Sequence, residues 1–153
     1  INFIVNAEPD SFAQRFARLH GPSICAIAFR VQDESTYECF YLRPTNGRAN
    51  DQLRRNHSTQ YISHPDYPWH RLRRENPGVY ESYVDLVPGE WTKVRIEVEG
   101  TQARLFVHGA AQPALIVNDL KMGTRRGTIA LWIGEGTVAY FRNVKWTTTR
   151  RGR

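Results

Sequence analysis

The chain has 153 residues, of which 41% are apolar and 24% are charged, and its formal net charge is +6. This size and balance are typical of one globular domain with a single core, so residues 1–153 are expected to form one domain. No apolar run approaches the roughly 18–20 residues that a transmembrane helix needs, which excludes a helical membrane span.

The positive charge comes mostly from clustered arginines, a pattern that nucleic-acid-binding proteins also show. Solvated loop charge is the favoured interpretation, because the clusters fall in loops and at the terminus and no nucleic-acid motif accompanies them. A protein- or nucleic-acid-interaction domain is therefore the third function class, and no nucleic-acid partner is expected. The clusters are Arg54-Arg55, Arg71/Arg73/Arg74, Arg125-Arg126 and Arg150-Arg151/Arg153.

The first predicted element is a helix. Phe12, Phe16 and Leu19 recur at helical spacing, and Gly21 follows the last of them. This pattern predicts a short amphipathic helix over residues 11–20. Because the chain begins at Ile1 rather than Met, an excised signal peptide fits, and a secreted or periplasmic location is favoured.

Alternation of apolar and polar residues with a period of two follows from residue 24 onward, which predicts β-strands. Many short strands separated by Gly and Pro turns indicate an all-β sandwich or barrel. Cys25 and Cys39 fall on adjacent strands of a predicted hairpin but at different levels, so we expect two small core residues rather than a disulfide. The predicted strands cover residues 24–31, 37–43, 80–86, 91–98, 103–108, 115–117, 127–133 and 138–146, before a polar tail at 147–153.

The connection over residues 44–79 is rich in aromatic, arginine and amide side chains and nearly lacks aliphatic ones. So long an irregular connection in a compact domain usually binds something. Flat rings stack on the apolar face of a pyranose, and arginines and amides suit its hydroxyls, so the segment predicts a carbohydrate site. An alternative for Trp69 is that its ring anchors the loop to the sheets. The predicted ligand-binding residues are Arg30, Arg43, Gln60, Tyr61, Trp69, Arg71 and Arg73.

The order of these elements resembles the concanavalin A-like lectin/glucanase superfamily, in particular the laminin-G-like and 3-keto-disaccharide hydrolase domains of bacterial sugar-degrading systems. The resemblance implies a two-sheet jelly-roll β-sandwich with a carbohydrate site on one sheet. It does not decide between a lectin-like binding module and a hydrolase. The matching pieces are Ala28-Phe29-Arg30, Tyr41-Leu42-Arg43-Pro44, Gln60-Tyr61 and residues 91–98, 127–132 and 140–144.

Catalysis by a glycosidase needs two carboxyl groups that face each other across the scissile bond. The Glu-x-Asp-x-(x)-Glu pattern of the superfamily's retaining glucanases is missing, so Glu38 and Glu81, on strands beside the long connection, are the candidate acid and base. The alternative for each is an ion pair with a nearby arginine.

No zinc-site spacing accompanies the histidines, and no cofactor is expected, although a structural calcium ion is compatible with such a fold. The preferred function is a carbohydrate-recognition domain. The alternative is a glycoside hydrolase of the 3-keto-disaccharide type.

Overall fold

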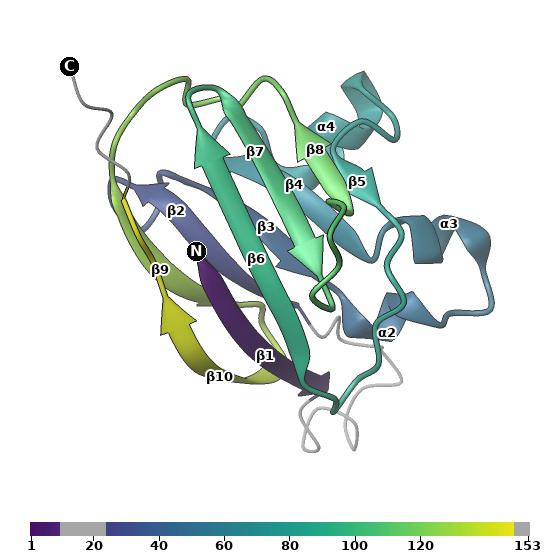
Figure 1. The fold of residues 1–153 in the computed structure, drawn as a ribbon. Helices are drawn as coiled ribbons and strands as arrows, with labels where there is room; N and C mark the ends of the chain where they lie inside the picture. The colour runs from purple at the N-terminus through teal and green to yellow at the C-terminus, as the bar shows by residue number, and fades with distance from the viewer. Residues whose placement is uncertain (10–23, 149–153) are drawn as a thin grey trace.

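The computed structural model describes residues 1–9 and 24–148 of the chain. Their secondary structure is mostly β, with two antiparallel sheets and a few short helices (Figure 1). The predicted helix over residues 11–20 and the end of the predicted tail lie outside the described residues. The elements are β1 (Asn2–Pro9), β2 (Cys25–Val31), β3 (Tyr37–Leu42), α2 (Pro44–Gly47), α3 (Gln52–Asn56), β4 (Thr59–His64), α4 (Trp69–Glu75), β5 (Glu81–Ser82), β6 (Thr92–Glu99), β7 (Gln102–Val107), β8 (Leu115–Val117), β9 (Thr128–Ile133) and β10 (Thr137–Lys145).

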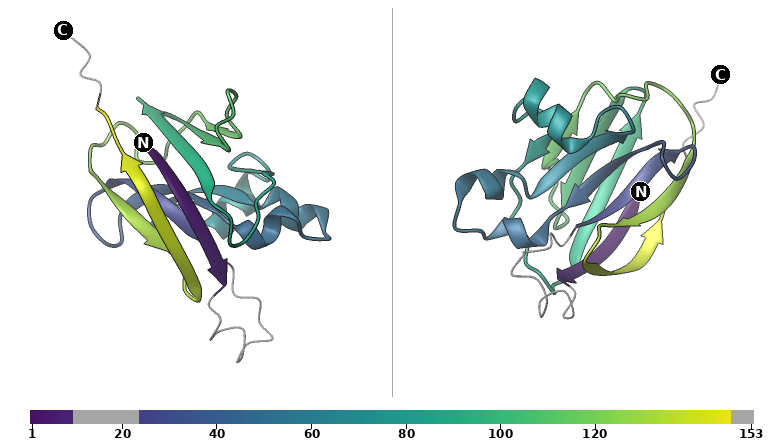
Figure 2. Two further views of the ribbon diagram at one scale, coloured as in Figure 1. Left: turned by 60° about the horizontal axis from the view of Figure 1, so that its bottom comes forward. Right: turned by 180° about the vertical axis from the view of Figure 1, so that it is seen from behind.

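The first sheet has the strand order β10-β1-β6-β7-β8, and the second has the order β5-β4-β3-β2-β9. Figure 2 shows the two sheets as layers. The chain passes from one layer to the other between β1 and β2, between β5 and β6, between β8 and β9, and between β9 and β10. Neighbours in a sheet are therefore often far apart in the sequence.

The core lies between the layers and takes residues from both sheets. Alternation along β6 turns one face of the strand inward, because successive side chains of a strand point to opposite faces. The inward residues of β6 are Val94 and Ile96, each 1% exposed. Phe40 and Tyr61 from the second sheet pack with their ring centroids 5.8 Å apart. A single shared core explains why neither sheet is expected to be stable without the other.

The predicted hairpin of β2 and β3 is confirmed. Ala28 pairs with Cys39 and Cys25 pairs with Leu42, so the two cysteines are neither opposite one another nor bridged. Both are buried core residues, as the sequence predicts. Burial raises the pKa of the Cys25 thiol to about 12.

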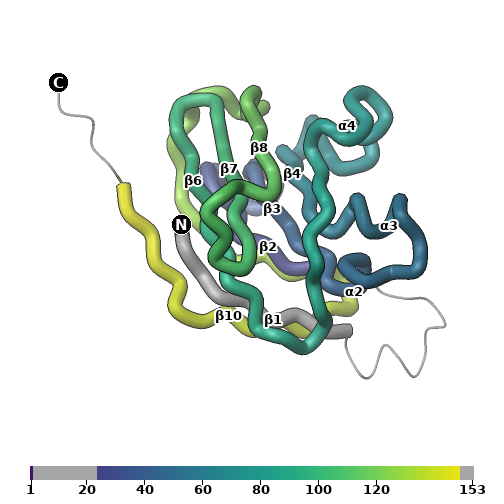
Figure 3. Tube along the Cα trace, turned by 45° about the vertical axis from the view of Figure 1, so that its right-hand side comes forward, coloured from purple at the N-terminus to yellow at the C-terminus, as the bar shows by residue number. Residues whose placement is uncertain are grey.

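The long irregular connection predicted over residues 44–79 is wrong in part. It contains β4, an interior strand of the second sheet, as well as α2, α3 and α4. Polar residues occupy both faces of β4, from Thr59 to His64, so alternation of apolar and polar residues does not reveal it. The predicted strand over residues 80–86 shrinks to the two residues of β5, and β1 was not predicted at all. Figure 3 shows that α2, α3 and α4 gather on the side of the molecule opposite β10.

Candidate functional site

One row of residues crosses the whole second sheet. Trp132, Ala26, Tyr41, Gln60 and Glu81 are successive partners on β9, β2, β3, β4 and β5. The rings of Tyr41 and Trp132 stack with their centroids 6.4 Å apart. The row therefore has an aromatic end at β9 and an ionisable end at β5.

Helix α4 brings a cation to the ionisable end of this row. Arg73 Nε donates a 2.9 Å hydrogen bond to Gln60 Oε1 and lies 2.8 Å from Glu81 Oε2. The helix is held against the protein by Leu72, its one buried residue, which is 1% exposed. Because Leu72 and Arg73 are adjacent, the packing of the first places the guanidinium of the second over the sheet.

A histidine also approaches the carboxylate of Glu81. His57 follows α3, and its Nε2 atom lies 3.3 Å from Glu81 Oε2. The side chains of His57 and Arg73 are 16% exposed and that of Glu81 is 9% exposed. Arg43, which follows β3, interacts electrostatically with Arg73 and His57. These four residues, Arg43, His57, Arg73 and Glu81, are called the Glu81 cluster below.

The Glu81 cluster contains three buried polar atoms that make no hydrogen bond. They are Arg43 Nε, Arg73 Nη2 and Glu81 Oε2. Glu81 Oε2 is close to the guanidinium of Arg73 and the imidazole of His57, but neither donates a well-directed hydrogen bond to it. Buried polar atoms are nearly always paired in folded proteins, so an unpaired group of two donors and one acceptor calls for an explanation.

Burial and neighbouring charges shift the protonation equilibria of this cluster. The pKa of His57 is lowered, and burial is the largest cause. The positive charges of Arg73 and Arg43 lower this pKa further, whereas the negative charge of Glu81 raises it. The neutral imidazole is therefore favoured near pH 7, which leaves two arginines and one carboxylate as the formal charges. Burial also raises the pKa of Tyr41 to about 12.

A groove of about 500 Å³ borders Glu81. Two apolar side chains on its rim are open to solvent, Leu53 at 66% and Tyr83 at 44% exposure. The groove therefore joins an apolar surface to the carboxylate of the cluster. Its lining residues are Leu53, Asn56, Pro77, Gly78, Glu81, Ser82 and Tyr83.

The structure does not bring Glu38 and Glu81 together. Glu81 pairs with Gln60, whose side chain meets α4 on the outer face of the second sheet. Glu38 is 0% exposed and accepts hydrogen bonds from Tyr61 Oη and from Met122 N, the latter at 3.1 Å, on the inner face. Two carboxylates on opposite faces of one sheet cannot flank one bond.

Arg30 and Tyr61 belong to the surroundings of Glu38 rather than to an open site. Arg30 Nη1 donates a 3.2 Å hydrogen bond to Glu38 Oε2, so the ion-pair alternative holds for this carboxylate. Tyr61 is 0% exposed and its hydroxyl accepts a 2.9 Å hydrogen bond from Lys121 N. A ring that is fully buried offers no stacking surface to a ligand.

Trp69 and Arg71 lie on α4 and are not members of the Glu81 cluster, although Trp69 borders Arg73. Trp69 is 48% exposed, with the guanidinium of Arg73 4.9 Å from its ring centroid. Arg71 pairs with Glu75 at 2.9 Å and also donates to the carbonyl oxygen of Asp66. Of the predicted ligand-binding residues, the structure thus gathers Arg43, Gln60 and Arg73. It adds His57, which lacks any spacing signal and comes close only through the fold.

Among residues 1–9 and 24–148, no group of three or more His, Cys, Asp or Glu side chains is arranged to hold a metal ion. The possible calcium ion stays a prediction. None of the helices that the structure describes is long and apolar enough to cross a membrane.

Comparison with known proteins finds similarity at the N-terminal part of the chain. Residues 1–52 match a family described as hydroxyphenylpyruvate dioxygenase, HPPD, N-terminal. A hemolysin VllY of Vibrio vulnificus (strain CMCP6) is 61% identical over 36 residues, which are 24% of this chain and 10% of that protein. A 4-hydroxyphenylpyruvate dioxygenase of Pseudomonas sp. (strain P.J. 874) is 61% identical over 33 residues, 22% of this chain and 9% of that protein.

A 3-dehydroshikimate dehydratase of Pseudomonas putida (strain KT2440) is 56% identical over 34 residues, 22% of this chain and 5% of that protein. The chain therefore spans a tenth or less of the length of these curated relatives. No solved structure matches.

These findings correct the resemblance drawn from the sequence. The matched family is a hydroxyphenylpyruvate dioxygenase N-terminal family rather than a concanavalin A-like, laminin-G-like or 3-keto-disaccharide hydrolase one. The carbohydrate-recognition function and the glycoside hydrolase alternative are wrong by the same finding, since the matched family is a dioxygenase family and the relatives given above are named as a hemolysin, a dioxygenase and a dehydratase. The matched stretch contains Tyr41 and Arg43, whereas His57, Arg73 and Glu81 lie beyond it.

Proposed function

We propose that this protein binds a small organic acid that carries a ring and a hydroxyl group, at the Glu81 cluster and the groove beside it. One observation carries the proposal. Arg43 Nε, Arg73 Nη2 and Glu81 Oε2 are buried without hydrogen-bond partners. Two donors and one acceptor are satisfied together by a ligand that offers a carboxylate and a hydroxyl.

The chemistry of each group fits such a ligand. A carboxylate accepts charge-assisted hydrogen bonds from the two guanidinium groups, which are about twice as strong as neutral ones. A hydroxyl donates to Glu81 Oε2. The ring packs against Leu53 and Tyr83 at the rim of the groove. With His57 neutral, the two arginines exceed the one carboxylate, which favours an anionic ligand.

The names of two relatives support the ligand class. The dioxygenase is named for 4-hydroxyphenylpyruvate, which by its name carries a hydroxyl, a phenyl ring and a keto acid. The dehydratase is named for 3-dehydroshikimate, which is also a carboxylate. The shared stretch is short, so these compounds serve as first probes for this chain rather than as assigned ligands.

The test is calorimetric titration of the 153-residue chain with 4-hydroxyphenylpyruvate and, separately, with its methyl ester. The acid is expected to bind at least about 10-fold more tightly, because a hydrogen bond to a charged group contributes about 1.5–3 kcal/mol. Arg43→Met keeps the aliphatic stem and is expected to remove that preference. Arg48→Met is the matched control, because Arg48 pairs with Asp85 on an exposed surface. Equal binding of acid and ester, or no binding of either, would contradict the proposal.

We further propose, from the sequence, that the two sheets form a jelly-roll sandwich with a short helix over residues 11–20, and that residues 1–153 are one domain. Crossing of the chain between sheets at β1–β2 and β9–β10 supports the jelly roll. We also propose, from the sequence, a secreted or periplasmic location.

A further inference from the structure

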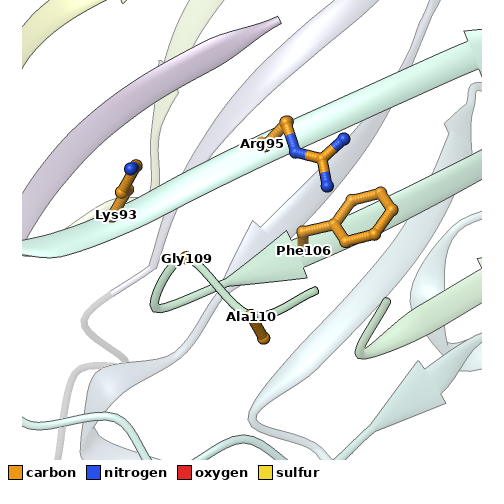
Figure 4. Close-up of a pocket in the computed structure, with 5 residues that line it drawn as sticks. All are labelled: Lys93, Arg95, Phe106, Gly109 and Ala110. Carbon is orange, nitrogen blue, oxygen red and sulfur yellow. The ribbon is translucent and has the colours of Figure 1, made fainter. Parts of the chain in front are cut away.

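The outer face of the first sheet collects side chains that are far apart in the sequence. On β6, Val94 and Ile96 are core residues, so Lys93 and Arg95 point away from the core. Phe106 on β7 is the partner of Arg95 and lies on the same face. Figure 4 shows the guanidinium of Arg95 beside the Phe106 ring, and its carbon Cζ lies 3.6 Å from the ring centroid.

Strand β10 extends this face across β1. Arg142 pairs with Ile4, which pairs with Lys93, so Arg142 and Lys93 fall in one row. Lys145 and Arg95 fall in another row, through Asn2. Strands lie about 4.8 Å apart, so the Cα atoms of the two basic residues in each row are about 10 Å apart. The rows form a track of positive charge across three strands.

Aromatic rings stand at one end of the track. Trp91, just before β6, is 42% exposed, and Tyr140 on β10 is 53% exposed. The guanidinium carbon of Arg142 lies 4.1 Å from the Trp91 ring centroid. The arginine covers part of the Trp91 ring and leaves part of it exposed. A second flat group can stack on a ring in this arrangement.

Carboxylates on this face gather at its other end. Glu97 lies between Arg95 and Arg104, 3.2 Å from Arg104 Nη2, and Glu99 is the last residue of β6. Neither residues 91–96 nor β10 contains an acidic residue. The end that carries Trp91 and Tyr140 therefore presents Lys93 and Arg142 with no carboxylate from residues 91–96 or from β10, and the one acidic residue of β1 is Glu8, which pairs with Val138.

We propose that this face, formed by Trp91, Lys93, Arg95, Tyr140, Arg142 and Lys145, binds single-stranded nucleic acid. A phosphate backbone follows the cation track, and unpaired bases stack on the exposed rings, which is how sequence-tolerant single-strand binding works. A duplex keeps its bases stacked on one another, and an anionic membrane or sulfated polysaccharide has no base to stack. The rings therefore favour the single strand among polyanions. The loop arginines of the sequence do not form this surface, which explains why it was not predicted.

The experiment measures fluorescence anisotropy of a labelled 20-nucleotide oligo-dT titrated with the full 153-residue chain at 50 and 200 mM salt. The expected dissociation constant at the lower salt is about 1–100 μM, and it rises with salt because counterions are released on binding. Trp91→Ala and Tyr140→Ala are each expected to weaken binding by about 5- to 150-fold, which corresponds to 1–3 kcal/mol per stacked base. Thermal unfolding of each variant checks that the fold is kept.

Two control variants match these changes elsewhere on the surface. Trp69→Ala removes a tryptophan that is 48% exposed on α4, and Arg125→Ala removes an exposed loop cation. Both are expected to bind oligo-dT as the unchanged protein does. The proposal is overturned if oligo-dT does not bind at 50 mM salt, if Trp91→Ala binds normally, or if duplex DNA, heparin or anionic vesicles bind more tightly than the single strand. The Glu81 cluster lies on the second sheet, so acid binding and oligonucleotide binding can fail independently.

Discussion

Arg30 owes its position to an irregularity in β2. The strand register with β9 shifts between Ala28 and Val31, and Arg30 has a φ of 53°. Such a bulge re-aims a side chain, so Arg30 reaches Glu38 on the inner face although simple alternation places it outside. Gly127 permits this path, because a Cβ atom there would lie 2.4 Å from the carbonyl carbon of Arg30.

Replacing Glu38 by Gln is expected to lower the free energy of unfolding by about 3–5 kcal/mol, because it leaves the guanidinium of Arg30 buried without its counter-charge. Urea unfolding measures the change. Glu75→Gln, which breaks an exposed pair within α4, is the control and should leave the unfolding midpoint unchanged. A loss below about 1 kcal/mol for Glu38→Gln would show that the Arg30–Glu38 pair contributes no more than an exposed ion pair does.

Two histidines couple stability to pH. Burial lowers the pKa of His57, with Arg73 and Arg43 adding to it, and burial followed by the charge of His70 lowers the pKa of His64. As pH falls below about 6.5, the unfolded chain binds protons at these positions before the folded protein does, so stability falls.

Urea unfolding at pH 7.5 and pH 5.5 is expected to show lower stability at the acidic value. The double variant His57→Gln/His64→Gln should show a smaller drop over the same interval. The drop in each protein is measured relative to its own stability at pH 7.5, where the histidines of the unfolded chain are also mostly neutral. A drop as large as in the unchanged protein would assign the pH dependence to other groups.

At the scale of elements, α2 is fixed by a close contact with the connection between β5 and β6. Gly47 ends α2 against Leu86 of that connection, and an added Cβ atom would lie 2.3 Å from Leu86 O. Gly78 differs, because its φ is 76° and an added Cβ atom would meet nothing within 4 Å. The first glycine is needed for space and the second for backbone conformation.

Asparagine separates these two requirements, because it tolerates the left-handed region better than other residues. Gly78→Asn is expected to unfold near the midpoint of the unchanged protein, whereas Gly47→Asn should lose about 1–3 kcal/mol or more through collision with backbone atoms. Thermal and urea unfolding of the two variants measure this difference. If Gly47→Asn loses as little stability as Gly78→Asn, α2 can move away from Leu86.

At the scale of the whole molecule, the matched stretch of residues 1–52 is not a separate module. It supplies β1 to the interior of the first sheet and β2 and β3 to the interior of the second. β1 pairs with β6 and β10, and β2 pairs with β9, all from beyond residue 52. Removal of this stretch therefore breaks both sheets.

Fragments 1–52 and 53–153 are accordingly expected to be unfolded when each is produced alone. Circular dichroism should show no β signal with a cooperative thermal transition for either fragment, in contrast to the full chain. A cooperatively folded fragment 1–52 would show that the stretch shared with the dioxygenase family is an autonomous unit.

Alternation along Cys25–Val31, Tyr37–Leu42 and Thr92–Glu99 was enough to predict their strands and the β2–β3 hairpin, because local pattern and burial agree there. It was not enough for β4, because that strand buries polar residues such as Gln60, whose hydrogen bond from Arg73 only the tertiary structure supplies. The binding region predicted from the composition of residues 44–79 stays a prediction, but the fold does bring Gln60 and Arg73 of this segment into contact, with Arg43 nearby.

The partition of the carboxylates was decided by the tertiary structure alone. Strand register places Glu38 on the inner face of the second sheet and Glu81 on its outer face, and this register has no signal in the spacing of the two residues. The same holds for His57, which reaches Glu81 through α3, and for the cation track, whose members come from β6 and β10. Sequence periodicity reports which face of a strand is apolar. Which strands become neighbours, and so which polar groups meet, depends on long-range pairing that a local pattern does not encode.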